Sequence, residues 1–215
     1  MEPTASGRPG GLFIVLDGGE GCGKSTQARH LSAALMQRGH SVHVFRDPGT
    51  TRIGELIRAI LLNPDHDEMA MRCEMLLYMA ARAQMMSETI LPLLSKGHTV
   101  ICDRFISSTL AYQLGGEGLT EADIRTVGDI AIQSRWPDRV IVLDMPVERS
   151  IARVQRAKDR IEQRPLSYHE QVRQRFLAQA RMDPGRYRVI DADRPESAVA
   201  ADVLGAVLGE RVVRS

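Results

Sequence analysis

The chain alternates short apolar segments with longer segments in which apolar residues recur every three or four positions. Leu12 to Asp17 (LFIVLD) is almost entirely apolar and is followed by glycines, which is typical of a strand buried on both faces of a parallel sheet. Four more segments have this character and predict strands: Ser41 to Arg46, Thr99 to Asp103, Arg139 to Asp144 and Tyr187 to Asp191.

The segments between and after these strands have helical spacing. They are Lys24 to Arg38, Ile53 to Leu62, Glu68 to Lys96, Glu121 to Gln133, Glu148 to Ala157, Tyr168 to Met182 and Glu196 to Leu208. Gly39 and Gly97 directly follow two of them and are expected as C-terminal caps. Five strands separated by helices predict a doubly wound α/β fold, with a five-stranded parallel sheet flanked by helices.

The length of 215 residues fits one domain over residues 11–215, preceded by a short flexible tail at residues 1–10. The net charge is +1, from 28 basic and 27 acidic residues, which argues against a nucleic-acid or membrane partner bound through bulk charge.

A secretory signal or a membrane-spanning apolar run is not expected, so the predicted location is the cytoplasm. Cys22, Cys73 and Cys102 are odd in number and widely spaced, and are expected as reduced thiols.

A glycine-rich sequence connects the first predicted strand to the first helix. Gly18 to Ser25 reads GGEGCGKS and matches G-x-x-x-x-G-K-[ST]. In this context the backbone N–H groups and the helix start cradle phosphates, while Lys24 reaches the β- and γ-phosphates and Ser25 ligates Mg²⁺. The motif predicts binding of a nucleoside triphosphate.

The sequence narrows the reaction that follows binding. A GTPase needs a base-reading N-K-x-D motif. The chain lacks this motif, because Asn63 is its only asparagine and no lysine follows it, which argues against a GTPase switch. A motor ATPase usually closes its second-motif strand with an acidic pair, whereas here Asp103 is followed by Arg104. An acid that can organise Mg²⁺ beside an arginine that can hold another phosphate indicates a site for two phosphorylated substrates.

Further residues indicate where a second substrate would bind. Arg46 and Arg104 each follow a predicted strand, so they should converge at the carboxyl edge of the sheet. Tyr78 and Arg82 are four residues apart and share one helix face. Each has an ordinary structural explanation, such as a turn ion pair, a core aromatic or a solvated charge. Their joint occurrence near one edge favours an acceptor site.

Together these motifs resemble the thymidylate kinase family, over about residues 12–196. The motifs that carry the resemblance are the phosphate loop with Glu20 inside it, R-D-P-G at Arg46 to Gly49, L-Y-M-A-A-R-A-Q at Leu77 to Gln84, D-R-F at Asp103 to Phe105, S-T-L-A-Y-Q at Ser108 to Gln113, D-R-I-E at Asp159 to Glu162 and I-D-A at Ile190 to Ala192. The resemblance implies a P-loop nucleoside monophosphate kinase that phosphorylates dTMP to dTDP with ATP and Mg²⁺ in de novo and salvage dTTP synthesis, and a homodimer.

The resemblance also implies roles for individual residues. ATP would contact Gly18, Gly19, Glu20, Gly21, Cys22, Gly23, Lys24, Ser25, Thr26 and backbone near Ala192 and Asp193. In the acceptor site, Tyr78 would stack on thymine, Arg82 would donate to its 4-oxo group, and Thr109 would face the base edge. Tyr112 would crowd the sugar 2′ position and Glu20 would lie near the 3′-hydroxyl. Arg46 and Arg104 would hold the dTMP phosphate, and Gln113 is also expected among the residues that bind dTMP. Asp103 would help place the metal, together with Ser25.

The catalytic arginine is expected in a lid at about residues 148–164. Some members of the family carry a basic residue within the phosphate loop, but Gly19 to Cys22 contain none. The lid candidates are therefore Arg153, Arg156 and Arg160, beside Lys24 and Asp103 as the other catalytic residues. The alternative interpretation of this arginine-rich segment is an ordinary solvated helix face.

Four positions depart from the family pattern: Thr50, Phe105, Ser107 and Leu114. Substrate contacts expected of a Tyr or His at 105, or of an Asp at 107, cannot be carried over. Two other functions stay open, a kinase of another nucleoside monophosphate or small acceptor and a non-catalytic ATP-binding module. All basic residues except Lys24, Lys96 and Lys158 are arginines, either from coding bias or because oriented hydrogen bonds to phosphate are needed.

Overall fold

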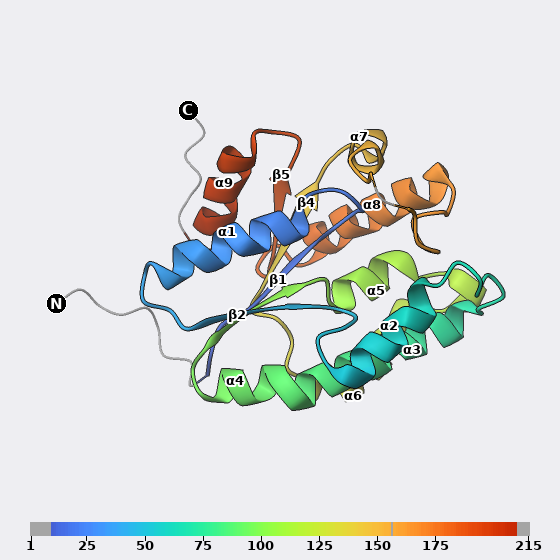
Figure 1. Ribbon diagram of the computed structural model, residues 1–215, viewed down its shortest axis with the longest axis horizontal. Helices are drawn as coiled ribbons and strands as arrows, with labels where there is room; N and C mark the ends of the chain where they lie inside the picture. The colour runs from blue at the N-terminus through green and yellow to red at the C-terminus, as the bar shows by residue number, and fades with distance from the viewer. Residues whose placement is uncertain (1–9, 156, 210–215) are drawn as a thin grey trace.

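The computed structural model describes residues 10–155 and 157–209, so residues 1–9 of the expected tail and Arg156 lie outside the described residues. A five-stranded parallel sheet runs through the centre of the molecule (Figure 1). Its strands are β1 (Phe13–Gly18), β2 (Val42–Arg46), β3 (Thr99–Asp103), β4 (Arg139–Asp144) and β5 (Tyr187–Asp191), in the order β2-β3-β1-β4-β5. The predicted fold class is confirmed.

Helices cover both faces of the sheet (Figure 1). The described helices are α1 (Lys24–Met36), α2 (Arg52–Leu62), α3 (Met71–Met85), α4 (Leu91–Ser95), α5 (Ile106–Tyr112), α6 (Glu121–Ile132), α7 (Val147–Ala152), α8 (Leu166–Met182) and α9 (Glu196–Leu208). A π turn, Met86–Ile90, joins α3 to α4, and a short 3₁₀ turn spans Gly116–Gly118. None of the described helices has the length and apolar character needed to span a bilayer.

Alternate residues of β1 enter two separate apolar cores. Ile14 and Leu16 pack with residues of α1 and α9, including Leu31 and Val203. Phe13 and Val15 point to the opposite face, where they meet residues of α3, α5, α6 and α8. Burial on both faces explains why the strand sequence is continuously apolar rather than alternating.

The carboxyl ends of the strands share one edge of the sheet. Arg46 at the end of β2 pairs with Asp103 at the end of β3, and Asp103 in turn pairs with Leu16 of β1. On the other side of β1, Asp144 of β4 pairs with Asp191 of β5. The loops that leave this edge therefore converge, as the sequence predicts.

Three helical segments differ from the prediction. The segment 68–96 is continuously helical from Met71 to Ser95, but a π turn at Met86–Ile90 interrupts the regular α-helix just before Pro92, which lacks an N–H donor. The segment 148–157 is helical only as far as Ala152. Helix α5 was not expected, since Ser and Thr favour helices weakly; burial of Ile106 and Leu110 outweighs that propensity.

Candidate functional site

The phosphate loop lies between β1 and α1 and is packed tightly against two neighbours. A Cβ atom on Gly18 would lie 2.4 Å from the carbonyl oxygen of Leu143, and one on Gly21 would lie 1.9 Å from that of Ser150. Both glycines also have positive φ, +133° and +69°. Side chains are therefore excluded here by contact with β4 and α7 as well as by backbone conformation.

Lys24 begins α1 and turns its ammonium group back into the loop. Its Nζ donates to the carbonyl oxygens of Gly19 at 2.6 Å and Gly18 at 3.3 Å. The side chain is buried, and it lies beside the positive N-terminal end of a 13-residue helix. This arrangement puts fixed positive charge where the sequence predicts bound phosphates.

Ser25 and Asp103 meet across the ends of α1 and β3. The hydroxyl of Ser25 donates to Oδ2 of Asp103 at 2.6 Å. A hydroxyl oxygen and a carboxylate oxygen are hard ligands of the kind that Mg²⁺ binds together with water and substrate phosphates. The residues present thus fit the predicted metal site.

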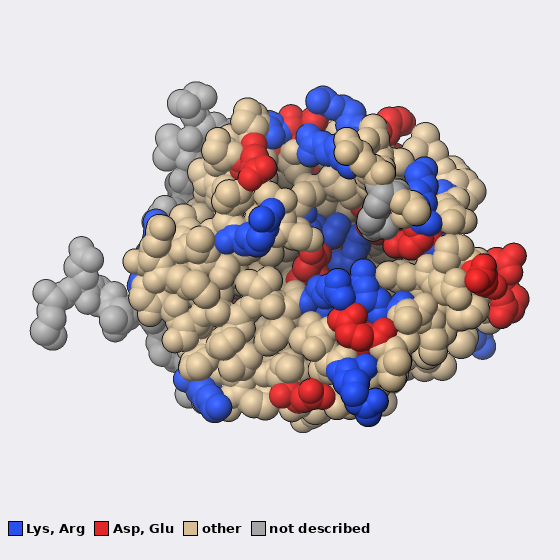
Figure 2. Space-filling model, viewed as in Figure 1, with Lys and Arg blue, Asp and Glu red and all other residues tan. Residues whose placement is uncertain are grey.

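A wide cleft opens in front of the phosphate loop. Its volume, including the open mouth, is about 1120 Å³. Figure 2 shows Lys and Arg side chains gathered around a hollow on this face of the molecule. The basic side chains that line the cleft are Lys24, Arg46, Arg58, Arg104 and Arg153, and Ser25, Thr26 and Asp103 also line it.

Arg104 connects this cleft to the loop and to α5. Its Nη2 donates to Glu20 at 2.6 Å, and its Nη1 donates to the carbonyl of Gly18 at 3.1 Å and to the Ser108 hydroxyl at 3.0 Å. The guanidinium lies 5.0 Å from the ring centre of Tyr112, whose hydroxyl donates to the same Glu20 oxygen at 3.0 Å. The acid inside the phosphate loop is thus held by two partners from beyond β3.

The electrostatics of this cluster keep Glu20 ionised. Burial opposes its ionisation, but the charges of Arg104 and Lys24 and the hydrogen bond from Tyr112 lower the pKa of the Glu20 carboxyl to about 2. The negative charge offsets part of the positive charge of Arg104. It also supplies an acceptor oxygen at the boundary of the cleft.

A second cavity, of about 540 Å³ including its open mouth, adjoins the cleft and has the residues expected for the acceptor site. Tyr78, Arg82, Arg104, Thr109, Tyr112 and Gln113 all line it, together with Glu20. Arg82 is buried and donates through Nε to Asp47 at 2.5 Å and through Nη1 to Thr109 at 3.3 Å. Because Asp47 fixes one side of its guanidinium, Arg82 has a defined orientation at the cavity wall.

Two of the four departures from the family pattern, Phe105 and Ser107, have local explanations in the fold. Phe105 is buried and packs edge-to-face on Phe13 at 5.0 Å, with the guanidinium of Arg82 at 5.2 Å from its ring centre. Ser107 donates to Asp17 at 2.6 Å, as Ser108 does. Burial raises the pKa of the Asp17 carboxyl in spite of the charge of Arg104 and these two hydroxyls. Phe105 therefore serves core packing beside Arg82, and Ser107 serves a buried hydrogen bond to Asp17.

Three other predicted binding residues, Arg46, Gln113 and Ala192, have hydrogen-bond partners within the fold. Arg46 lines the cleft but donates to both carboxylate oxygens of Glu55, at 3.0 and 2.8 Å. Gln113 donates to Glu74 at 2.7 Å. Ala192 is buried after β5, where its N–H donates to the carbonyl of Asp144.

The three lid arginines of the prediction have different surroundings. Arg153 lines the cleft and lies 4.0 Å from Asp193. Arg156 lies outside the described residues. Arg160 is buried against Glu74 of α3 and does not line the cleft. Among the described candidates, only Arg153 faces the cleft that holds Lys24.

The structure adds Arg58, which no sequence motif singles out, and places two residues of the D-R-I-E motif in the acceptor cavity. Arg58 of α2 lines both cavities and donates to the carbonyl of Pro48 at 2.9 Å. Asp159 and Ile161, from the segment between α7 and α8, line the acceptor cavity. A helical arginine soon after the Arg46 turn is a usable sequence signal for Arg58. The D-R-I-E motif marks Asp159 and Ile161 but does not predict that they line the acceptor cavity.

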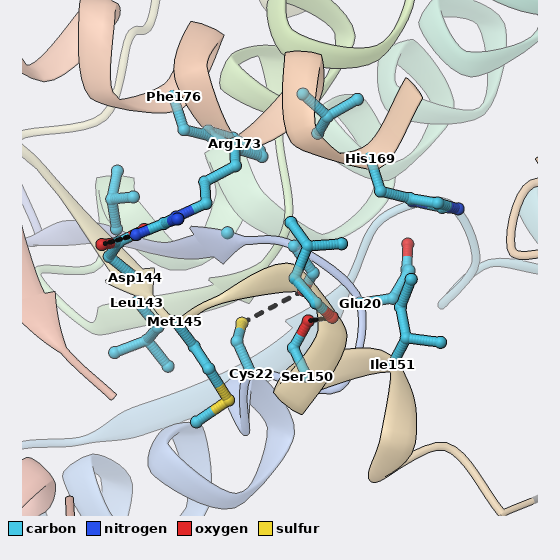
Figure 3. Close-up of a pocket in the computed structure, with 15 residues that line it drawn as sticks. Glu20, Cys22, Leu143, Asp144, Met145, Ser150, Ile151, His169, Arg173 and Phe176 are labelled. Atoms are coloured by element: carbon cyan, nitrogen blue, oxygen red, sulfur yellow. Dashed lines mark hydrogen bonds and ion pairs between the residues drawn. The ribbon is translucent and has the colours of Figure 1, made fainter. Parts of the chain in front are cut away.

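Behind the phosphate loop lies a mostly apolar cavity (Figure 3), which shares Glu20 with the cleft and with the acceptor cavity. Gly18, Gly19, Glu20 and Cys22 line it from the loop side, and Met145, Ile151 and Phe176 line it from the protein interior. Cys22 donates to the carbonyl of Gly19 at 3.1 Å, and burial raises the pKa of its thiol. Cys22, Cys73 and Cys102 are free thiols.

Comparison with known proteins gives one consistent result. A family model described as thymidylate kinase matches residues 16–203. A thymidylate kinase from Alcanivorax borkumensis is 44% identical over 191 residues, which is 88% of this chain and 92% of the relative. One from Pelotomaculum thermopropionicum is 46% identical over 199 residues, 91% and 92% of the two chains. The crystal structure of thymidylate kinase from Ehrlichia chaffeensis has a TM-score of 0.74 at 29% identity and covers 91% of this chain and 98% of that one.

Proposed function

Because the chain belongs to the thymidylate kinase family, we propose that it transfers the γ-phosphate of ATP to dTMP, giving ADP and dTDP. One observation carries this proposal: Glu20, Asp47, Arg58 and Arg104 line both the phosphate-loop cleft and the acceptor cavity. A triphosphate in the cleft and a monophosphate in the cavity would therefore bring their phosphates together beside Arg104.

The acceptor cavity is suited to a pyrimidine deoxynucleotide. Tyr78 offers an aromatic face for the base, and Arg82, oriented by Asp47, donates to a 4-oxo group. Thr109 lies at the same edge, within hydrogen-bond distance of Arg82. Tyr112, held by Glu20, narrows the region assigned to the sugar and disfavours a 2′-hydroxyl.

Phosphate groups would be held mainly by arginines and by the loop. Arg104 presents a planar fork at the junction of the cavities, and Arg46 reaches the same cleft once it exchanges Glu55 for a phosphate. The loop N–H groups and Lys24 bind the donor phosphates. We place adenine against the backbone of Ala192 and Asp193.

Ser25 and Asp103 would hold Mg²⁺, the expected cofactor. When bound, the ion neutralises charge on the donor phosphates. The acceptor phosphate is already ionised, so the protein needs to align and neutralise the reacting groups rather than remove a proton. Arg153, at the edge of the cleft, is the described lid arginine that can add positive charge to the transferring group.

We also propose that the chain forms a homodimer through α2 and α3, which pack along each other. Ile53, Leu56 and Ile60 of α2 and Leu76 of α3 are exposed by 41 to 58%. Apolar side chains gathered on adjacent helices are typical of a protein interface. A cytoplasmic location is consistent with the free thiols and with the nucleotide substrates.

The acceptor preference tests the proposed function. ADP release would be measured with ATP and, in turn, dTMP, dUMP, CMP and AMP as acceptor. We expect the highest kcat/KM for dTMP, because Arg82 and Thr109 match its base edge and Tyr112 disfavours ribose. A higher kcat/KM for another monophosphate would favour the alternative, a kinase of a different acceptor.

A further inference from the structure

The fold contains a buried carboxylate, Glu74, that has no part in the proposed phosphate transfer. Its side chain on α3 is fully buried. One oxygen accepts a hydrogen bond from Gln113 at 2.7 Å, and the other accepts from Arg160 at 2.5 Å and Arg164 at 2.7 Å. A charge is retained in such a place only when its partners compensate for desolvation.

Arg160 reaches Glu74 from the segment that connects α7 to α8. Besides the ion pair, its Nε donates to the carbonyl of Leu61 at 2.9 Å, and its backbone N–H donates to the carbonyl of Leu62 at 3.3 Å. Leu61 and Leu62 end α2. Arg160 thus fastens this loop segment to the end of α2 and to the first turn of α3.

The neighbours of Arg160 form part of the acceptor cavity. Asp159 and Ile161 line it together with residues that include Leu62 and Tyr78. Tyr78 follows Glu74 by one helical turn, so the ion pair and the aromatic wall share a helix face. Moving Arg160 away from Glu74 would move the two residues on either side of it out of the cavity wall.

A second branch strengthens the same attachment. Arg164 donates to the hydroxyl of Tyr168 at 2.5 Å, and that hydroxyl donates to the carbonyl of Tyr112 at 2.8 Å. The network therefore reaches the end of α5, from which Tyr112 enters the acceptor cavity.

We propose that the Glu74–Arg160 ion pair is a latch that holds residues 159–161 as a wall of the acceptor cavity, so that Arg160 is a positioning residue for dTMP binding. This inference rests on the proposed function. It separates the roles of the lid arginines: Arg153 faces the phosphates, whereas Arg160 acts through the loop that it fastens.

Arg160→Gln tests the latch without leaving the buried carboxylate alone, because Arg164 and Gln113 still donate to Glu74. At saturating ATP we expect the KM for dTMP to rise about tenfold, while kcat changes by less than about twofold and the KM for ATP stays constant. A role in acceptor binding alone predicts a higher KM for dTMP with kcat and the KM for ATP nearly unchanged. General damage to the fold would change all three constants.

Arg160→Lys keeps the charge but cannot bind Glu74 and the Leu61 carbonyl through one planar group. Its KM for dTMP should fall between those of the wild type and Arg160→Gln. The matched control is Arg125→Gln, which breaks a half-exposed ion pair with Glu121 on α6 and should leave all three constants unchanged. Thermal unfolding of each variant reports whether it is folded.

Two results would overturn the latch. A fall in kcat with an unchanged KM for dTMP would assign Arg160 to the transferring phosphate, and unchanged constants in a folded Arg160→Gln variant would leave the ion pair with a structural role only. A wild-type protein that does not phosphorylate dTMP would instead overturn the proposed function, and the latch with it.

Discussion

At the scale of single residues, Arg104 has the most consequential contacts of the site. It holds Glu20, the carbonyl of Gly18 and the ring face of Tyr112 at the junction of the two cavities. Arg104→Ala should raise the KM for dTMP roughly thirtyfold, since a charge-assisted hydrogen bond contributes about 2 kcal/mol. Steady-state kinetics at saturating ATP measure this, and an unchanged KM refutes the assignment.

Glu20 makes stability depend on pH in a defined direction. Its pKa of about 2 in the fold lies below the ordinary value of 4.5. Its contribution to the free energy of unfolding is therefore fully present above pH 4.5 and is lost as pH falls towards 2. As the pH falls from 4.5 towards 2, the free energy of unfolding measured with denaturant should decrease more for the wild type than for Glu20→Gln.

The comparison of the two proteins isolates Glu20 from other buried carboxyls. Asp17 and Asp47 have raised pKa values because of burial, so they act in the opposite direction, but both proteins contain them. If the difference in unfolding free energy between wild type and Glu20→Gln were constant over this window, Glu20 would not be the titrating group.

Residues fixed by a local motif could be predicted, but those fixed by distant partners could not. The position of Lys24 follows from the loop and the helix start, both of which are visible in the sequence. The partner of Arg160 is a helix residue 86 positions away, and only the packing of three elements brings them together. A charged segment alone cannot distinguish an arginine that faces phosphate from one that fastens a loop.

At the scale of elements, the contact between the phosphate loop and α7 sets the position of the lid. The carbonyl of Ser150 lies where a side chain on Gly21 would be, and it also accepts the N–H of Arg153 at 3.2 Å. Gly21→Ala should therefore displace α7, lower kcat about tenfold or more through misplacement of Arg153, and lower the melting temperature.

Gly39→Ala is a matched control for this substitution. Gly39 also has a positive φ, +84°, but a Cβ there would meet open space. Its backbone strain should cost roughly 1 kcal/mol of stability without an effect on kcat. Equal melting temperatures and equal kcat values for the two variants would contradict a specific role for the Gly21–Ser150 contact.

The boundaries of helices and strands are predictable where the pattern of buried residues and the intrinsic helix or strand propensity agree. The predicted strands at 99–103, 139–144 and 187–191 coincide with β3, β4 and β5. Helix α5 and the early end of α7 were not predicted, because the first depends on tertiary burial of a Ser- and Thr-rich segment and the second has few apolar anchors. Both elements border the site, where the secondary structure favoured by the local sequence often differs from the one that the whole fold requires.

At the scale of the whole molecule, the net charge of +1 conceals a concentration of basic side chains at one cleft. Five basic residues line one cleft, and the acids among them are paired or placed for a metal. The prevalence of arginine has a structural use at Arg82, Arg104 and Arg160, each of which makes two or more oriented contacts.

The proposed dimer predicts a change in molecular mass. Leu56→Glu places a charge in the apolar α2–α3 face, so light scattering after size-exclusion chromatography should find a dimer for the wild type and a monomer for the variant. Leu208→Glu changes a partly exposed leucine on α9, across the sheet, and should remain dimeric. A monomeric wild type would contradict the proposed interface.

The most direct test of the account is the identity of the products. Purified wild-type protein with ATP, Mg²⁺ and dTMP should form ADP and dTDP in equal amounts, as measured by chromatography of the nucleotides. Lys24→Met should fold normally and form both about a hundredfold or more slowly, because one charge that stabilises the transferring group is gone. ADP formed without dTDP, or turnover unaffected by Lys24→Met, would contradict phosphate transfer to dTMP at this site.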